Sequence, residues 1–158
     1  MVTIIRSRGD RSLRDLVDLE KGTVAREIYV NEAIYQQELE QIYTRAWLFI
    51  GHESQVPNPG DFVMSRMGEE EVLLVRDRKN KLHVFLNTCR HRGMKVCRYD
   101  DGNTLLFTCP FHGWSYDTDG ALVGVPHHKA AFHEELVKGD WGLHEVPQMA
   151  NYFGSIWA

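Results

Sequence analysis

The stretch NTCRHRGM, residues 87–94, places a cysteine and a histidine one residue apart in a chain that has only 3 cysteines. A second stretch, CPFHGW, residues 109–114, separates its cysteine from its histidine by two residues. On an extended chain, alternate residues point to the same side about 6.6 Å apart, so Cys89 and His91 can face one site from a single loop. Two loops that each offer one thiolate and one imidazole predict a shared metal centre.

Two metal atoms suit this ligand set better than one. The spacing of Cys89 and His91 does not favour coordination of a single small ion by both side chains. One iron could instead bind both cysteines and a second iron both histidines. That arrangement is the Rieske form of a 2Fe-2S cluster, in which two imidazoles replace two thiolates on one iron. We therefore predict that Cys89, His91, Cys109 and His112 are the cluster ligands.

A structural zinc site is the alternative use of the same four side chains, because two cysteines and two histidines can complete a tetrahedron. Common zinc sites begin with a closely spaced pair of cysteines, which the C-x-H spacing fits poorly. The third cysteine, Cys97, has no histidine or cysteine at ligand spacing, and we expect it to be a buried thiol.

Composition excludes several classes of protein. The 158 residues are 43% hydrophobic, which is sufficient for a folded domain with a core. The formal net charge of −4 argues against nucleic-acid or anionic-membrane partners, which usually leave a basic footprint. No apolar run approaches the ~20 residues of a membrane span, and the start of the chain lacks the apolar region of a secretory signal. A cytoplasmic protein is expected.

Residues 1–46 are predicted to form an α-helical N-terminal extension. Ser12 and Asp15 resemble a capping box before a short helix that Gly22 would end. Asn31 is the cap candidate of a longer amphipathic helix, because apolar residues recur after it at spacings of three and four.

From Trp47 onward, short apolar runs alternate with turn signals. The runs lie at residues 46–52, 62–67, 71–77, 81–88, 103–109, 114–117 and 121–125. Residues 126–144 are expected to form a loop with one helical turn, and returning strands are predicted at 145–149 and 152–158. The predicted fold of residues 47–158 is all-β: an antiparallel sandwich with two cluster-binding hairpin loops at one end.

The two motifs and their flanks resemble the Rieske domain of the large (α) subunit of bacterial aromatic-ring-hydroxylating dioxygenases, which are Rieske non-haem iron oxygenases. The resemblance rests on CRHRG and CPFHGW, on RAWLFIGHESQVPNPGDFV before them and on GALVGVP after them. It implies a 2Fe-2S cluster that passes electrons from a ferredoxin or reductase to a mononuclear iron. The parent enzyme would use NAD(P)H-derived electrons and dioxygen to add two hydroxyls to an aromatic ring as a cis-dihydrodiol.

The resemblance also implies partners: the catalytic domains of its own and of a neighbouring α subunit, a homo-oligomeric intact enzyme and, as an open option, a β subunit. His112 is the expected electron exit, through an aspartate of the neighbouring subunit. His128 and His133 have the spacing of the mononuclear iron motif, but Val125 stands where the motif has aspartate or asparagine. No catalytic residue is therefore assigned, and the catalytic domain is expected to lie outside this chain. The apolar run that ends at Ala158 likewise suggests a piece of a longer protein.

A free-standing Rieske-type ferredoxin is the alternative function. The helical extension argues against it, because a small carrier has no need of such a prefix. Respiratory Rieske proteins have an extra cysteine in each loop and a serine after the second His-Gly pair, and Met94, Phe111 and Trp114 stand at those positions here. Fewer hydrogen bonds to the sulfurs predict a midpoint potential near the lower end of the range of about −150 to +300 mV.

Overall fold

The computed structural model of the chain describes residues 12–133 and 135–158. The chain divides into two compact units, residues 1–46 and 47–158, and each is described by itself. The first eleven residues of the expected extension lie outside the described part. Within the described residues, no helix is long and apolar enough to cross a membrane.

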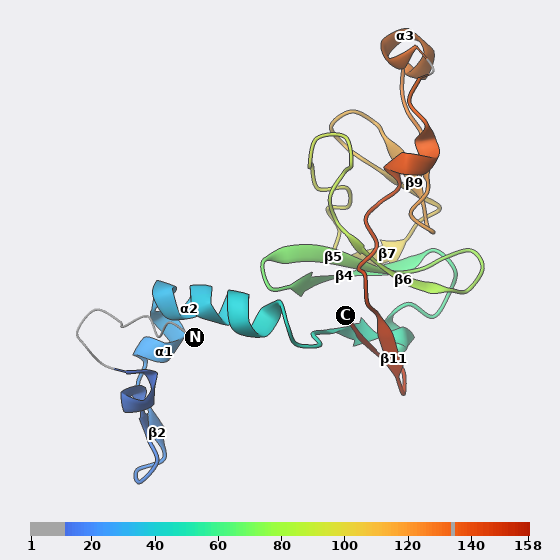
Figure 1. The fold of residues 1–158 in the computed structure, drawn as a ribbon. Coiled ribbons are helices and arrows are strands. Elements are labelled where there is room, and N and C mark those ends of the chain that lie inside the picture. Colours follow the sequence, from blue (N-terminus) through green and yellow to red (C-terminus); the bar gives the residue numbers. More distant parts are fainter. Residues whose placement is uncertain (1–11, 134) are drawn as a thin grey trace. The chain divides into compact units, whose positions relative to one another are not determined.

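The described part of the first unit contains a 3-10 turn, a small hairpin and a broken helix (Figure 1). Its elements are η1 (Leu13–Leu16), β1 (Val17–Asp18), β2 (Thr23–Val24), α1 (Glu27–Val30), α2 (Glu32–Glu38) and the π-helical turn η2 (Leu39–Tyr43). The side chain of Asn31 accepts hydrogen bonds from the backbone N–H groups of Ala33 (2.9 Å) and Ile34 (3.3 Å). The predicted helix start at Asn31 is therefore confirmed.

The predicted first helix is wrong beyond its first turn. After η1 the chain turns back as a hairpin in which Val17 pairs with Val24. The carboxylate of Asp18 accepts hydrogen bonds from the backbone N–H groups of Glu20 (3.1 Å) and Lys21 (3.0 Å). An aspartate that binds the backbone ahead of it stabilises a turn in preference to a helix.

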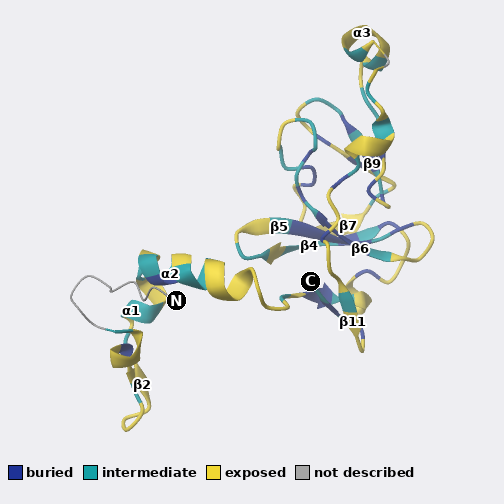
Figure 2. Ribbon diagram, in the orientation of Figure 1, coloured by how far each residue is buried: buried dark blue, intermediate teal, exposed yellow. Residues whose placement is uncertain are grey.

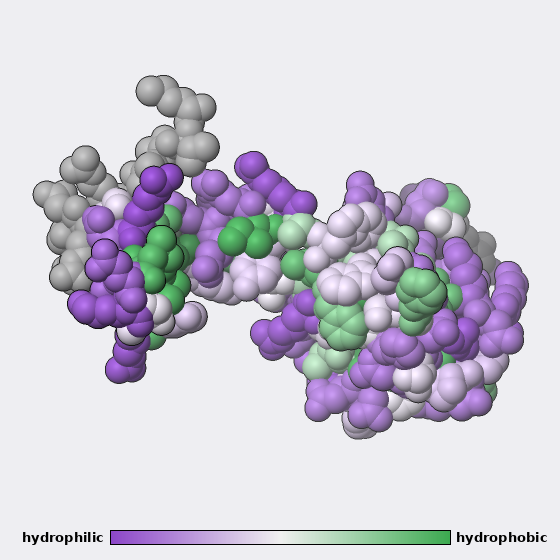
Figure 3. Space-filling view, turned by 90° about the horizontal axis from the view of Figure 1, so that it is seen from below, coloured by the Kyte–Doolittle hydropathy of each residue, from purple (hydrophilic) through white to green (hydrophobic). Residues whose placement is uncertain are grey.

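The first unit leaves several apolar side chains at its surface. Leu19, Tyr29 and Val30 are exposed, and apolar side chains lie among hydrophilic ones on the surfaces of both units in Figure 3. Leu16 and Ile34 are buried within the unit.

The second unit is built from three antiparallel sheets. The central sheet has the order β6-β5-β4-β7, and the two smaller sheets have the orders β10-β9-β8 and β11-β12-β3. The strands are β3 (Phe49–His52), β4 (Asp61–Met67), β5 (Glu70–Arg76), β6 (Leu82–Leu86), β7 (Asp101–Asn103), β8 (Leu106–Thr108), β9 (Ser115–Asp117), β10 (Leu122–Gly124), β11 (Ala150–Tyr152) and β12 (Ser155–Trp157). The prediction of an all-β antiparallel fold is confirmed.

The middle residues of β5 and β6 are buried and are coloured dark blue in Figure 2, whereas β4 is mostly half-buried and β7 is exposed. Side chains alternate across a strand, so neighbours on β5 enter different cores. Leu73 and Val75 pack in a core with the cluster loops, whereas Val72 and Leu74 pack in a second core with β3 and β12. The first core thus includes two of the predicted cluster ligands, Cys89 and Cys109.

The segment that follows the cluster loops carries two short helical elements, α3 (His128–Phe132) and the 3-10 turn η4 (Lys138–Trp141), where one helical turn was expected. The predicted strand at 145–149 is wrong. Only Glu145 makes a bridge, with Phe85, and Pro147 has no N–H with which to continue a ladder.

The last predicted strand, 152–158, is instead the second half of a hairpin. Phe153 (φ 49°) and Gly154 (φ 86°) both have left-handed backbone angles, as a two-residue hairpin turn of type I′ requires. The returning strand β12 pairs with β3, which brings the end of the unit beside its beginning.

Candidate metal centre

The first cluster loop is a tight hairpin that follows β6. Cys89 N donates a hydrogen bond to Met94 O (2.8 Å), and Gly93 N donates to Cys89 O (2.9 Å). Gly93 has a φ of 72°, a left-handed angle that suits glycine and aims the chain back toward its start. His91 lies at the tip of this turn.

The second cluster loop, between β8 and β9, repeats the first. Cys109 N donates to Trp114 O (2.8 Å), Gly113 N donates to Cys109 O (3.0 Å), and Gly113 also has a φ of 72°. The two loops therefore have equivalent backbone conformations, although the histidine lies two residues after the cysteine in one and three after it in the other, at His112.

Asn87 closes the base of the first loop. Its side chain is buried, donates to Cys97 O (2.8 Å) and accepts from Cys97 N (2.8 Å), as a neighbouring strand would. Cys97 is buried, so its prediction as a buried thiol is confirmed. The two residues fix the loop whose tip carries His91.

The structure brings the four predicted ligands together as a thiol pair beside an imidazole pair. Cys89 and Cys109 are both 2% exposed. Burial raises the pKa of the Cys89 thiol, and the nearby Cys109 thiol also raises it, although a hydrogen bond with the Tyr116 hydroxyl lowers it. The ring centroids of His91 and His112 are 4.6 Å apart. In the described part of the chain, no three His, Cys, Asp or Glu side chains form a group suited to a single ion.

The donor set fits a two-iron cluster in a further respect. His91 Nδ1 is buried and has no hydrogen-bond partner among the described residues, which is uncommon for a buried polar atom. Burial first, and His112 second, lower the pKa of His91, so its ring favours the neutral form that binds metals. A free lone pair on a neutral imidazole is what a metal ligand requires.

The surroundings of Cys89 include Tyr116, which the sequence does not predict as part of the site. Its hydroxyl lies 3.2 Å from Cys89 Sγ and accepts a hydrogen bond from Arg90 N (3.1 Å). Burial, with the adjacent Cys89, raises the pKa of Tyr116 far above its usual value, so the hydroxyl keeps its proton. A metal-bound thiolate has no proton to donate, so with Cys89 as a ligand the Tyr116 hydroxyl would be the donor to the sulfur. The only signal in the sequence is that Tyr116 of β9 follows Trp114 by two positions. Alternate residues of an extended chain point to the same side, so Tyr116 faces the same core as Trp114.

The remaining histidines of interest lie on the α3 segment. His128 Nε2 lies 3.0 Å from Leu136 O, so that nitrogen is used within the segment. His133 lines a cavity beside His91.

The family model of the Rieske [2Fe-2S] domain matches residues 46–148. The chain therefore belongs to the Rieske [2Fe-2S] domain family, whose cofactor is a 2Fe-2S cluster.

Within that family the chain is related to α subunits of aromatic dioxygenases. It is 48% identical over 149 residues to the biphenyl 2,3-dioxygenase subunit alpha of Rhodococcus jostii (strain RHA1), which covers 94% of this chain and 32% of the relative. It is 42% identical over 157 residues to a benzene 1,2-dioxygenase subunit alpha of Pseudomonas putida, covering 99% of this chain and 34% of the relative. The predicted resemblance to α subunits is confirmed.

A solved structure leads to the same family. Naphthalene 1,2-dioxygenase from Rhodococcus sp. bound to indole superimposes with a TM-score of 0.82 at 41% identity, over 92% of this chain and 33% of that chain. The chain spans about a third of the length of the relatives it matches.

Proposed function

We propose that residues 47–158 form the Rieske electron-transfer domain of an aromatic-ring-hydroxylating dioxygenase α subunit. Cys89 and Cys109 would bind one iron, and His91 and His112 the other. The observation that carries the proposal is the pair of equivalent hairpin loops, which brings two buried thiols and two imidazoles to one place. A single tetrahedral zinc gives no reason for such a division into pairs.

When bound, the cluster would take up and release one electron at a time. The chain's own residues prepare the site for this. The core beneath the loops keeps water from the thiols of Cys89 and Cys109. Tyr116 directs a hydrogen bond at Cys89, and a hydrogen bond to a ligating sulfur favours the more negative, reduced form.

We infer that His112 is the side from which electrons leave. Its ring centroid lies 3.8 Å from that of Phe111, which is 60% exposed, so this half of the imidazole pair borders the surface. An outer imidazole nitrogen at the surface can meet a carboxylate of another domain, as the family resemblance implies. Replacing that carboxylate in the intact enzyme would then slow electron transfer without changing the cluster's spectrum.

The whole enzyme would carry out cis-dihydroxylation of an aromatic substrate with electrons from NAD(P)H. A ferredoxin or reductase would supply them, and a mononuclear iron in the catalytic domain of an α subunit would receive them. The biphenyl and benzene dioxygenase names of the relatives support an aromatic substrate. We expect a cytoplasmic homo-oligomer, with or without a β subunit, in which residues 1–46 form the N-terminal extension. The chain by itself is expected to leave substrate unchanged.

Metal counting on a matched pair of variants tests the ligand assignment. Cys89→Ser removes a proposed ligand, whereas Cys97→Ser makes the same change at a buried cysteine outside the ligand set. The wild type and Cys97→Ser should each hold about two irons per chain, and Cys89→Ser should lose them. One zinc per chain, or iron that survives Cys89→Ser but not Cys97→Ser, would contradict the proposal.

A further inference from the structure

The ring of His91 is backed by a buried aromatic side chain. Trp114 lies parallel to it, with ring centroids 4.8 Å apart and an interplanar angle of 11°. Trp114 is itself 2% exposed, so it cannot tilt without displacing the core around it. The orientation of His91 therefore depends on the position of Trp114.

A residue far along the chain also contacts Trp114. Trp141, in η4, meets the Trp114 ring edge-on at a centroid distance of 5.7 Å and an angle of 80°. The guanidinium of Arg90 lies 5.7 Å over the Trp141 ring, and its Nη1 contacts His144. Edge-to-face aromatic contacts and cation–π contacts both favour one defined geometry.

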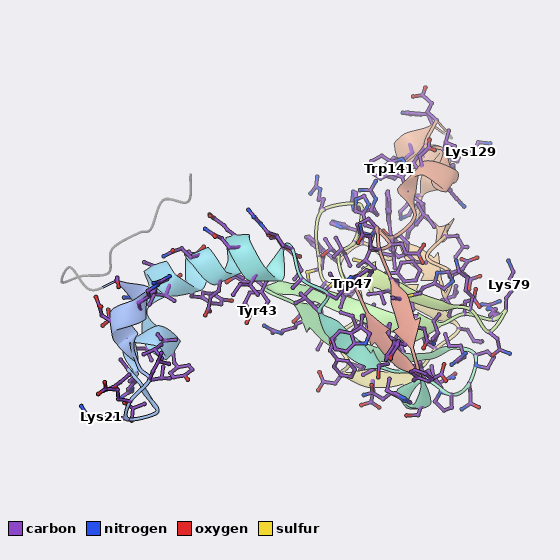
Figure 4. The ribbon with its side chains drawn as sticks, turned by 60° about the horizontal axis from the view of Figure 1, so that its bottom comes forward. Lys21, Tyr43, Trp47, Lys79, Lys129 and Trp141 are labelled. Carbon is purple, nitrogen blue, oxygen red and sulfur yellow. The ribbon has the colours of Figure 1, made fainter. Side chains whose placement is uncertain are left out.

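These contacts close a circuit between three segments, which we name the aromatic brace: His91 and Arg90 of the first loop, Trp114 of the second loop, and Trp141 of η4. Figure 4 shows Trp141 near α3, at the end of the second unit away from Trp47. Trp141 belongs to neither cluster motif, so its place beside His91 arises only in the folded chain.

The second histidine has different neighbours. The ring contacts of His112 are with His91 and with Phe111, which is exposed. Both imidazoles are half-buried, but their ring contacts differ: buried Trp114 stacks on His91, whereas exposed Phe111 contacts His112.

A cavity of about 540 Å³ lies beside His91, and Trp141 forms part of its wall together with Trp114, Phe132 and Asp140. Replacing the indole of Trp141 with a smaller side chain would widen this cavity. Water would then approach His91 more closely, and the Trp114 ring would keep its edge-to-face contact with Phe132 but lose the one with Trp141.

We propose that Trp141 is a positioning residue for His91, which acts through Trp114 to fix the imidazole and to restrict access of water to it. The inference rests on the proposed role of His91 as a cluster ligand. Greater exposure to water stabilises the reduced cluster, because that form has the additional negative charge. Loss of Trp141 should therefore raise the midpoint potential and make the iron easier to extract.

The test compares Trp141→Leu with Trp47→Leu, the same change at a half-exposed tryptophan at the start of the same unit. Three quantities are measured on the iron-loaded protein: the EPR g-values, the midpoint potential and the rate at which a strong chelator removes iron. Trp141→Leu should shift the g-values and raise the reduction equilibrium constant about threefold, which is about 30 mV at 59 mV per tenfold change. Iron extraction should be at least about threefold faster, and Trp47→Leu should match the wild type in all three.

The outcomes separate the two proposals. A wild type without a two-iron EPR signal refutes the proposed function itself. A normal wild type with Trp141→Leu indistinguishable from Trp47→Leu overturns the brace alone. If Trp141→Leu cannot retain iron, Trp141→Phe decides the matter: its smaller ring should give an intermediate extraction rate, and a wild-type rate would overturn the inference.

Discussion

The substitution Tyr116→Phe isolates one hydrogen bond to a proposed cluster ligand. It removes the donor that lies 3.2 Å from Cys89 Sγ while keeping the aromatic ring, which is fully buried. It also leaves Arg90 N without the acceptor it has at 3.1 Å. A change in potential is expected because the bond is stronger when the sulfur has more negative charge.

The size of the change follows from ordinary hydrogen-bond energies. A hydrogen bond to a charged group contributes about 2 kcal/mol, and we assign about half of it to the difference between the redox states. For one electron, about 1.4 kcal/mol corresponds to 59 mV, so Tyr116→Phe should lower the midpoint potential by about 40 mV.

The assay is a redox titration at fixed pH, followed by visible absorption, with Tyr99→Phe as the control. Tyr99 is 73% exposed, so its hydroxyl can exchange a partner for water, and the control should match the wild type. A Tyr116→Phe potential that equals the wild type within about 10 mV, or lies above it, would refute the role assigned to the hydroxyl.

Three further predictions concern stability, measured by denaturant unfolding. Burial alone would raise the pKa of Asp77, but hydrogen bonds from Lys81, His83 and Lys79 outweigh it and hold that pKa below its usual value. The ionised carboxylate therefore stabilises the fold at neutral pH, and the stability is lost as pH falls through the folded pKa. Asp77→Asn should cost about 1–2 kcal/mol at pH 7 and less below about pH 4, and a difference that does not depend on pH would contradict this. Gly120→Ala should lower the free energy of unfolding by about 3 kcal/mol, because Gly120 has a φ of +84° and an added Cβ would lie 2.6 Å from a ring carbon of buried Phe85. At Gly139 an added Cβ would have no heavy atom within 4 Å, so Gly139→Ala should be nearly neutral, and equal costs for the two substitutions would refute the packing argument. Asn31→Ala should cost about 1 kcal/mol in helix stability through loss of the cap, and an unchanged helical signal and unfolding midpoint would argue against it.

The sequence predicts the parts of the site that depend on local spacing. Both loops are recognisable because their cysteines, histidines and glycines are close together, and the structure brings their side chains to one place. The helix start at Asn31 is likewise a local signal, since one side chain caps its own helix. Single residues decided the errors. Asp18 binds its own turn and ends the first helix, and Pro147 stops the strand predicted after Glu145.

Contacts between distant segments could not be predicted in the same way. Tyr116 and Cys89 lie in different loops, 27 residues apart in the sequence. Trp141 contacts Trp114 from an irregular segment, and the weak periodicity of that segment does not indicate which of its side chains are buried. The predicted low midpoint rested on the absence of a serine at position 114. Tyr116 adds one hydrogen bond to a sulfur that the prediction did not include, so the low midpoint stays a prediction.

Low-temperature EPR of the dithionite-reduced chain, with iron and zinc counted on the same sample, distinguishes a Rieske cluster from a zinc site. The proposed ligand set predicts about two irons per chain and an anisotropic signal of the kind given by a 2Fe-2S cluster with two histidine ligands. An EPR-silent sample with one zinc per chain would contradict it and would make the two loops a structural metal site.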